Sequence, residues 1–429
     1  MSISPARTAA FEILLRVERE RAYASVLLPL FEENLSANDS ALCHELTLGT
    51  LRRQMPLDRV IDSLSAGRKI DIEVRIALRL GLYQLQHLTR VPAYSAINES
   101  VNLVGRVGKR SAKGFANAVL RRAQREAIDL AFQDETERIA VETSHPEWLI
   151  RKWSKDHGGE TARVIASTNN IVPEIAFRVI GDRTLAVDKQ IAVSRPSETV
   201  DGCYLATGNN REVYQLADSG KIYIQDEASQ MVAHAMSVPM EGHFLDVCAA
   251  PGGKTGLMVE KYANKAVIYA GDLHTTRINL LRANCRRQGA DSVHILQYDA
   301  ERGLPFADRT FEAVLLDAPC SGTGTIRRNP EIRYFIGPAD IAELSAKQLR
   351  ILENASKLVK SGGTVNYSTC SLEIEENEHV CERFLAGSPD FEMAMPGVAS
   401  RFLTADGFAR TWPHRDGMDG FFLASFRRK

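Results

Sequence analysis

Two cysteines directly follow apolar segments of the chain, where a reactive side chain can be held by a rigid strand. Cys320 stands in DAPCSG after the run FEAVLLD, and Cys370 stands in STCS after GTVNY. One buried cysteine would be ordinary packing, but two of them near Asp317 call for another explanation. Thiolates are strong nucleophiles once a nearby cation lowers the thiol pKa, and Lys254 is the candidate cation. These residue types predict a reaction that uses a thiolate.

Methylation of cytosine at C5 needs this set of groups. C5 is a poor nucleophile, and attack of a thiolate on the neighbouring C6 moves electron density onto it. A carboxyl group at N3 stabilises the charge that develops on the ring. C5 then takes the methyl group, a base removes the C5 proton, and the thiolate leaves. A stacked base has to leave its stack before it can enter such a pocket.

The elements that position these residues begin at about residue 236. From there, apolar segments of strand length alternate with helical segments: FLDVC, AVIYAG, VHILQ, FEAVLLD, GTVNYST and GFFLASF. Strands that are apolar throughout are buried on both faces, and strand–helix alternation indicates a parallel sheet with helices on both sides. Ligands of such sheets bind at the carboxyl ends of the strands. We therefore predict a Rossmann-like α/β domain whose informative residues follow each strand.

The loop after the first of these strands is CAAPGGKT, at residues 248–255. Its closing Gly-Lys-Thr matches a Walker A loop, but Cys248 occupies the first glycine position. Pro251 also lacks one of the backbone donors that would hold a phosphate. An NTPase site is therefore the minor alternative. Gly252 and Gly253 carry no side chain, so another ligand can approach the backbone closely.

Two aspartates follow the next two strands. Asp272 lies roughly twenty residues beyond the glycine turn, where doubly wound folds hold ribose hydroxyls; the alternative is that it only caps the next helix. Asp299 is placed to reach an adenine amino group, or is an ordinary turn aspartate. A site that can bind a nucleoside but has no phosphate-binding loop indicates S-adenosylmethionine as the ligand.

The N-terminal part of the chain differs from this pattern. Residues 1–138 have helical periodicity, as in LRLGLYQLQHL, and no strand-like alternation, which predicts a separate all-α unit. The stretch 101–125 has seven basic residues and no acidic one, although the net charge of the whole chain is −1. Such a block can bind phosphates, and the alternative is a solvated helix face. Residues 139–235 predict a small α+β region.

Length and composition set further limits. A chain of 429 residues is long for one domain, so several are expected. Its seven cysteines are odd in number and scattered, which does not make a disulfide framework and suits the reducing cytoplasm. No run of about 18 apolar residues predicts a membrane helix. We expect a cytoplasmic protein that is monomeric and has no metal site.

The segments LDVCAAPGGKT, LLDAPCSGTG and NYSTCS resemble the motifs of the RNA cytosine-5 methyltransferase family. The DNA enzymes place their nucleophile in the Pro-Cys motif, whereas the RNA family uses the Thr-Cys motif, so a chain with both cysteines points to RNA. The resemblance implies that Cys370 is the nucleophile and that Cys320 assists product release. It also implies that Asp317 contacts the base and that Lys254 orders the site.

The segments DSALCHELTLGTLRR, LRLGLYQLQHLTRVPAYSAINESV and GFANAVLRR resemble the NusB-like helical RNA-binding domain, so the resemblance covers nearly the full chain. It implies three domains: a NusB-like domain at 1–138, a linking or RNA-binding region at 139–235, and the catalytic domain at 236–429. The implied cofactor residues are Cys248, Ala249, Ala250, Pro251, Gly252, Gly253, Lys254, Asp272, Arg277, Asp299 and Asp317. The implied RNA contacts are Arg106, Lys109, Arg110, Lys113, Arg121, Arg122, Arg327 and Arg328.

The activity that the resemblance implies is methylation of one cytosine of 16S ribosomal RNA, at position 967 in its usual numbering, with S-adenosylmethionine as cofactor. The RNA would be free or partly assembled. A cytosine-5 methyltransferase acting on 23S rRNA or tRNA is an alternative, and so is a non-catalytic RNA-binding assembly factor. Three residues depart from the family's usual pattern: Asn366, Tyr334 and Tyr298 stand where an apolar residue, a tryptophan and a small residue are common. For Asn366 we favour a satisfied polar group on its strand over a contact near Cys370.

Overall fold

The chain forms two compact units in the computed structural model, which describes residues 3–181, 194–208, 210–236, 241–262 and 265–429. The first unit comprises the residues up to Val172 together with Ile326–Phe335. The second comprises Pro173–Thr325 and Ile336–Lys429. The division into three domains at residues 138 and 235 remains a prediction.

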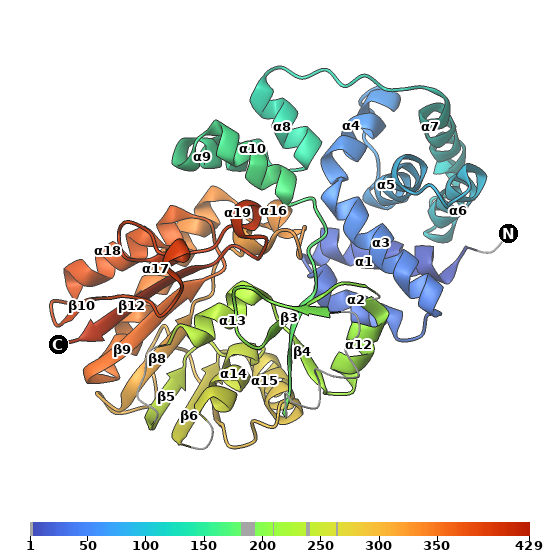
Figure 1. Ribbon diagram of the computed structural model, residues 1–429. Coiled ribbons are helices and arrows are strands. Elements are labelled where there is room, and N and C mark those ends of the chain that lie inside the picture. Colours follow the sequence, from blue (N-terminus) through green and yellow to red (C-terminus); the bar gives the residue numbers. More distant parts are fainter. Residues whose placement is uncertain (1–2, 182–193, 209, 237–240, 263–264) are drawn as a thin grey trace. The chain divides into compact units, whose positions relative to one another are not determined.

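Every described element of the first unit is a helix, which agrees with the periodicity of residues 1–138 (Figure 1). The described elements of residues 139–172, part of the predicted α+β region, are also helices. In α5 the leucines at i and i+4, Leu78 and Leu82, are fully buried, and Leu85 packs against the same core. The bounds are α1 (Pro5–Glu20), α2 (Ala24–Glu32), α3 (Ala37–Arg52), α4 (Gln54–Leu64), α5 (Ile72–His87), α6 (Ala93–Arg106), η1 (Arg110–Ala112), α7 (Lys113–Arg125), α8 (Glu135–Thr143), α9 (Glu147–His157), α10 (Gly159–Thr168) and α16 (Ile332–Phe335).

The segment Ile326–Phe335 follows Cys320 closely in sequence but belongs to the helical unit. The buried guanidinium of Arg333 donates to the backbone carbonyl of Thr143 at 2.9 Å. Burial lowers the pKa of Arg333 to about 10. The hydroxyl of Tyr334, one of the three unusual residues, donates to the carbonyl of Leu51 at 2.9 Å. Buried polar groups are costly unless hydrogen-bonded, so these bonds anchor the segment among the helices.

The second unit contains two sheets. The smaller has four antiparallel strands in the order β2-β3-β1-β4: β1 (Ala176–Val179), β2 (Ser194–Pro196), β3 (Cys203–Ala206) and β4 (Ile222–Ile224). The larger has the order β10-β12-β9-β8-β5-β6-β7, with β11 paired to β12. Its strands are β5 (Gly242–Asp246), β6 (Ala266–Asp272), β7 (His294–Gln297), β8 (Phe311–Asp317), β9 (Val359–Thr369), β10 (Phe391–Ala394), β11 (Ala409–Arg410) and β12 (Phe422–Arg428).

The large sheet is mixed. Its strands β5 to β9 pair in parallel, as predicted, whereas β12 runs antiparallel to both β9 and β10. The last apolar segment, GFFLASF, thus forms an antiparallel strand beside β9. Asn366 of β9 accepts a hydrogen bond from Ser425 of β12 at 2.7 Å, so its carbonyl group is satisfied by the neighbouring strand.

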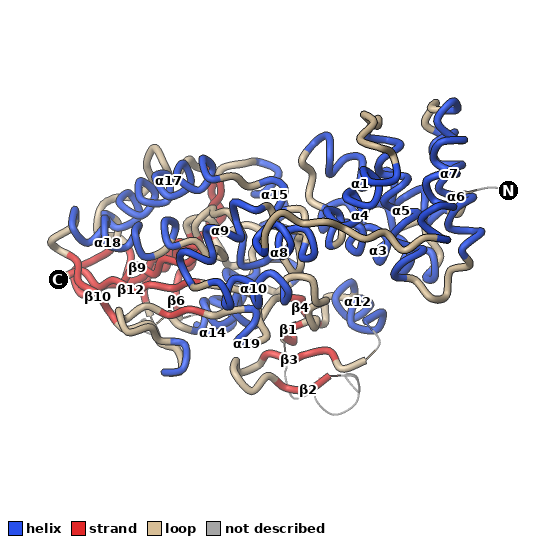
Figure 2. Tube along the Cα trace, turned by 90° about the horizontal axis from the view of Figure 1, so that it is seen from above, coloured by secondary structure: helices blue, strands red, loops and turns tan. Residues whose placement is uncertain are grey.

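Helices cover both faces of the large sheet because alternate side chains of each strand point to opposite sides. Val314 and Leu316 of β8 pack with α17 and α18, while Leu315 packs with α13, α14 and α15. Figure 2 shows α17 and α18 on one side of the strands and α14 on the other. The remaining bounds are α12 (Asn210–Asp218), α13 (Glu227–His234), α14 (Gly253–Tyr262), α15 (Thr275–Arg287), η2 (Thr323–Thr325), α17 (Pro338–Lys357), η3 (Ile374–Glu376), α18 (Glu378–Gly387), η4 (Ser400–Phe402) and α19 (Pro413–Asp416).

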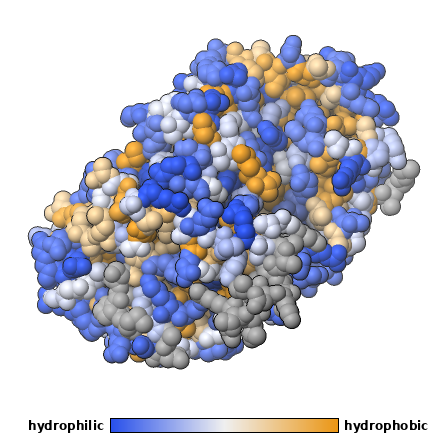
Figure 3. Space-filling model, viewed as in Figure 1, coloured by the Kyte–Doolittle hydropathy of each residue, from blue (hydrophilic) through white to orange (hydrophobic). Residues whose placement is uncertain are grey.

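The surface is mostly polar on the face drawn in Figure 3, with smaller groups of apolar residues between the hydrophilic ones. Large apolar side chains that remain exposed include Val26, Leu30, Tyr94 and Met395. Among the described residues, no helix is both long enough and apolar enough to cross a membrane.

Candidate active site

The two cysteine loops begin side by side because they leave neighbouring parallel strands. Asp317, the last residue of β8, pairs with Ser368 of β9 in the strand register. The backbone continues this pairing by one residue, since Ala318 N donates to Ser368 O at 2.8 Å. The carboxyl ends of β8 and β9 thus place both loops at the edge where ligands of such sheets bind.

The sulfur atoms of Cys320 and Cys370 lie 3.4 Å apart, within hydrogen-bond distance for two thiol groups. The hydrogen bond with Cys370 and burial hold the pKa of the Cys320 thiol well above its ordinary value. A thiol that keeps its proton is a donor, so Cys320 can donate to the sulfur of Cys370. The two sulfurs are therefore close enough to act on one base, and the Cys320 thiol is the one whose pKa is raised.

Lys254 and Asp317 form an ion pair beside these cysteines. The Nζ atom of Lys254 lies 2.6 Å from Oδ2 of Asp317, whose Oδ1 accepts from the Ser368 hydroxyl at 2.8 Å. The ammonium also lies 5.2 Å from the ring centroid of Phe421. Burial lowers the pKa of Lys254, but Asp317 outweighs this effect and raises it above the ordinary value. Lys254 is therefore a fixed positive charge at the strand ends.

The loop Cys248–Lys254 connects β5 to α14 and is held by hydrogen bonds to its backbone. Ala249 N donates to Gly271 O at 2.9 Å, and Asn284 donates to the carbonyl of Pro251 at 2.8 Å. Gly252 has a φ of +103°, and a Cβ there would lie 2.9 Å from a methyl group of Leu281. Glycine is required at this position by both conformation and space.

Asp272 and Arg277 brace the same loop. Oδ2 of Asp272 accepts from Ala250 N at 3.2 Å and from Nε of Arg277 at 3.1 Å, and Oδ1 accepts from Leu273 N at 2.8 Å. Arg277 also donates to the carbonyl of Ala250 at 2.8 Å. A carboxylate has further lone pairs, so these bonds orient Asp272 and leave acceptor capacity for a ligand. The helix-capping alternative is not what the geometry shows, since the N-cap residue of α15 is His274 and Asp272 accepts no bond from a backbone N–H of that helix.

Asp299 follows β7, the strand next to β6 in the sheet. Its side chain is 35% exposed, and Oδ1 accepts from Glu301 N at 3.1 Å. The preceding Tyr298 is buried, and its hydroxyl donates to the carbonyl of Val247 at 3.1 Å. This large residue fits where a small one is usual because the glycine opposite, Gly271, has no side chain: a Cβ there would lie 2.3 Å from the Tyr298 ring.

The basic residues predicted to contact RNA in the helical unit lie on or beside α6, η1 and α7: Arg106, Lys109, Arg110, Lys113, Arg121 and Arg122. Some of them pair with acidic side chains; for example, Lys109 Nζ lies 2.7 Å from Asp71. Exposed pairs of this kind are weak because solvent screens them, so phosphates can compete for these cations. Arg110 and Arg121 are exposed and form no ion pair within the described part of the chain.

The other two predicted RNA contacts, Arg327 and Arg328, lie in the segment Ile326–Phe335 of the helical unit. Arg327 is only 4% exposed, and its backbone carbonyl accepts from Arg52 at 3.0 Å. Arg328 is partly exposed. A direct contact between RNA and the Arg327 side chain would require this segment to move, whereas Arg328 is accessible as it stands. Contact at either residue remains a prediction.

Comparison with known proteins agrees with this arrangement of domains and motifs. The family model described as 16S rRNA methyltransferase RsmB/F matches residues 233–427, and the NusB family model matches residues 4–125. A protein of Bacillus subtilis (strain 168) named probable ribosomal RNA small subunit methyltransferase B is 35% identical, with 100% of both chains covered. The Pseudomonas putida ribosomal RNA small subunit methyltransferase B is also 35% identical over 97% of each chain. The chain belongs to the ribosomal RNA small subunit methyltransferase B family.

Solved structures agree with the fold of this methyltransferase. The crystal structure of PH0851 aligns with a TM-score of 0.86 at 25% identity and covers 100% of both chains. A methyltransferase homolog protein from Pyrococcus horikoshii aligns with a TM-score of 0.56 at 25% identity, covering 70% of this chain and 100% of its own. The second unit therefore has the S-adenosylmethionine-dependent methyltransferase fold, and S-adenosylmethionine is the cofactor.

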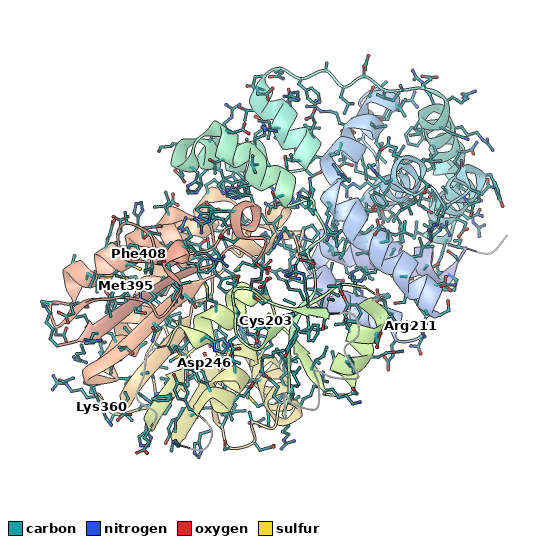
Figure 4. The ribbon with its side chains drawn as sticks, viewed as in Figure 1. Cys203, Arg211, Asp246, Lys360, Met395 and Phe408 are labelled. Atoms are coloured by element: carbon teal, nitrogen blue, oxygen red, sulfur yellow. The ribbon has the colours of Figure 1, made fainter. Side chains whose placement is uncertain are left out.

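The residues at the strand ends fit this cofactor. Asp272 retains acceptor capacity for ribose hydroxyls, and the glycines of the loop admit a ligand to the backbone. Asp246, the last residue of β5 and labelled in Figure 4, was not singled out from the sequence. It is 1% exposed; Oδ2 accepts from the Thr255 hydroxyl at 2.7 Å, and Oδ1 has no partner among the described residues. The sequence signal that could have identified Asp246 is an acidic residue at the end of a strand, just before a glycine-containing loop.

Asp246 gives the cofactor-free methyltransferase a specific pH dependence. Burial raises the pKa of Asp246 to about 7. Because this folded-state pKa is raised, the protonated carboxyl contributes stability that is complete below the unfolded pKa and is lost as pH rises through 7. The expected loss of stability between pH 5 and pH 7 is on the order of 3 kcal/mol. A bound cation such as the sulfonium of S-adenosylmethionine would favour the ionised form.

We therefore expect Asp246→Asn to be more stable than the wild type at pH 8 and to lose this advantage at pH 5. Its affinity for S-adenosylmethionine is expected to fall, because an amide cannot offset the positive charge of the cofactor. Urea unfolding of the cofactor-free protein at both pH values measures the first effect, and calorimetric titration measures the second. Equal stability changes at pH 5 and pH 8 would contradict the assignment of the buried charge.

Proposed function

We propose that the protein methylates C5 of one cytosine in 16S ribosomal RNA through a covalent bond between Cys370 and C6 of the base. The observation that carries the proposal is the pair of sulfurs 3.4 Å apart, next to the Lys254–Asp317 ion pair. Methylation of a base nitrogen or a ribose hydroxyl needs no thiol nucleophile, whereas methylation of an aromatic carbon does. The 16S target is supported by the names of the matching family model and of the relatives.

The residues act in sequence on the flipped base. Cys370 Sγ forms a bond to C6, and the electrons of the C5–C6 double bond move onto C5 and the conjugated ring. Asp317, held in place by Lys254 and Ser368, contacts N3 and passes to it the proton that the Cys370 thiol gives up, which neutralises the charge on the ring. When bound, S-adenosylmethionine supplies an electrophilic methyl group on a positively charged sulfur. After C5 is methylated, a base takes the C5 proton and N3 returns its proton to Asp317. The electrons of the C5–H bond restore the C5–C6 double bond as Cys370 leaves C6 as a thiolate, and Cys320 assists this release.

The proposal is tested by incubating the protein with S-adenosylmethionine that carries a labelled methyl group and with free 16S rRNA or assembled small subunits. The modified base is then mapped by nuclease digestion and mass spectrometry. We expect 5-methylcytosine at a single position, 967 in the usual numbering. A methyl group on another atom of the base, or on 23S rRNA or tRNA alone, would overturn the assignment.

We place the reaction in the reducing cytoplasm, which suits seven free cysteines.

The exposed cations of η1 and α7 are expected to contribute phosphate contacts. Each phosphate contact changes the slope of log affinity against log salt by about 0.7 to 0.9. Arg110→Gln with Arg121→Gln should therefore weaken RNA binding and reduce that slope by about 1.4 to 1.8, while the affinity for S-adenosylmethionine stays unchanged. Filter binding over a range of salt concentrations measures this slope.

A matched control removes two exposed cations from α9 and α10, through Lys155→Gln with Arg163→Gln. This double variant is expected to keep the wild-type slope, because its cations lie outside the basic segment. An equal reduction of the slope in both double variants would mean that the basic segment is not the phosphate-binding surface.

A further inference from the structure

A single buried carboxylate connects the two cysteine loops. Oε1 of Glu376 accepts hydrogen bonds from Ser321 N at 2.8 Å and from the Gln348 side chain at 2.9 Å. Oε2 accepts from the hydroxyl groups of Ser321 and Ser371. Ser321 directly follows Cys320, and Ser371 directly follows Cys370. Glu376 is thus bonded to the residue next to each cysteine.

Burial makes these bonds selective for a carboxylate. Glu376 is 0% exposed, and four donors converge on its two oxygens. A buried charge is tolerated only where hydrogen bonds compensate for lost water, and bonds to an ionised acceptor are about twice as strong as neutral ones. A glutamine at this position would keep the shape but turn one acceptor into a donor, so at least one of the four donors would lose its partner.

The other bonds between the loops do not replace this carboxylate. Gly324 N donates to Cys370 O at 2.9 Å, and Leu372 N donates to the hydroxyl of Thr323 at 3.0 Å. Each of these two bonds joins one pair of groups, and on the Cys320 loop each reaches the segment three or more residues beyond the cysteine. The hydroxyls of Ser321 and Ser371 also lie 3.0 Å apart, but both are bonded to Oε2 of Glu376, so this contact is held by the same carboxylate. Glu376 is also held from outside the loops, because Gln348 belongs to α17 and donates to the carbonyl of Pro319, directly before Cys320, at 2.9 Å.

We propose that Glu376 is a positioning residue that fixes the two cysteine loops relative to one another, so that both sulfurs can reach the same base. The inference rests on the proposed roles of Cys370 and Cys320. One sulfur bonds to C6 and the other assists release at the neighbouring C5, so the sulfurs have to remain close together during the whole reaction. A displacement of about 1 Å in a catalytic group can reduce the rate about 10²-fold.

Glu376→Gln tests this role. We expect kcat to fall about 10²-fold, with the KM for S-adenosylmethionine unchanged, because the cofactor residues are not bonded to Glu376. We also expect more enzyme to be covalently attached to RNA at steady state, since misplacement of Cys320 slows release of the adduct. The attached fraction is measured on a denaturing gel. Ser371→Ala, which removes one of the four donors, should show the same pattern with a smaller decrease of about 10-fold in kcat.

The control is Glu312→Gln, which neutralises a carboxylate at the start of β8, the strand whose other end carries Asp317. Glu312 accepts from His243 N at 2.6 Å and pairs with Lys360, which is labelled in Figure 4. Wild-type kcat and adduct level are expected. If both Glu376→Gln and Ser371→Ala turn over like the control, or if Glu376→Gln is inactive only because it is unfolded while Ser371→Ala is fully active, the positioning role is overturned.

Cys370→Ala in the same assays separates this inference from the function on which it rests. If Cys370→Ala still transfers methyl groups, the proposed function fails whatever Glu376 does. If Cys370→Ala is inactive and Glu376→Gln behaves like the wild type, only the inference about Glu376 fails.

Discussion

Cys370→Ala is expected to abolish both methyl transfer and the covalent enzyme–RNA adduct, whereas Cys320→Ala is expected to form the adduct and fail to release it. The reason is the asymmetry of the two sulfurs. Cys320 keeps its proton because the bond with Cys370 and burial raise its pKa well above the ordinary value. Cys370 lies on the loop that follows β9, and its sulfur is 3.4 Å from that of Cys320. The nucleophile is therefore expected to be Cys370 rather than the thiol whose pKa is raised.

The measurement uses single-turnover methyl transfer together with a denaturing gel that resolves free protein from protein bound covalently to RNA. Cys43→Ala is the matched control, since it removes a buried thiol from the helical unit and leaves the site intact. An adduct that survives in Cys370→Ala and disappears in Cys320→Ala would exchange the two roles. Loss of the adduct in both variants would mean that the sulfurs act as one unit in the attack.

Asp317→Asn is expected to cost both activity and stability. It leaves the ammonium of Lys254 without its partner, and removing one member of a buried ion pair costs about 3–5 kcal/mol. The side chains of Lys254 and Asp317 are 11% and 28% exposed, so solvent reduces this cost and we expect about 3 kcal/mol. Without Asp317, burial becomes the dominant effect on Lys254 and lowers its pKa. Methyl transfer should fall at least about 10²-fold, because the base loses its contact at N3.

The double variant Lys254→Met with Asp317→Leu separates the two effects. Replacing both partners of a buried pair by apolar residues is often neutral, so we expect stability within about 1 kcal/mol of the wild type and no methyl transfer. Urea unfolding and single-turnover transfer are measured on the same preparations. A double variant as unstable as Asp317→Asn would mean that the pair does more for the fold than for catalysis.

Much of the site follows from sequence because its parts are local. Apolar segments that alternate with helices define a parallel sheet, and the residues after each strand lie at its carboxyl edge. This rule predicts that Cys320, Cys370 and Asp317 lie at one edge of the sheet, and the pairing of β8 with β9 in the structure places the two loops side by side. The family motifs added the separate roles predicted for the two cysteines and the prediction of the cofactor loop. These motifs are short enough to be recognised in a single chain.

The positions that sequence reasoning missed depend on contacts between distant segments. Glu376 stands in the acidic run EIEENE, which resembles a solvated turn, and only the packed loops show that it is buried. For Arg327, whose contact with RNA stays a prediction, the sequence contained no sign that its segment belongs to the helical unit, where the side chain is 4% exposed. Burial and long-range partners decide such cases, and neither has a periodic signal along the chain.

The sequence by itself predicted the chemistry that we propose for this protein, since two thiols, a lysine and an aspartate at strand ends indicate a reaction before any distance is known. The tertiary structure alone decided how these groups differ from one another. It set the 3.4 Å separation of the sulfurs, the raised pKa of Asp246 and the carboxylate that joins both loops. The physical reason is that charge, burial and hydrogen bonding depend on which atoms meet in space, whereas residue type and the alternation of strands with helices are written along the chain.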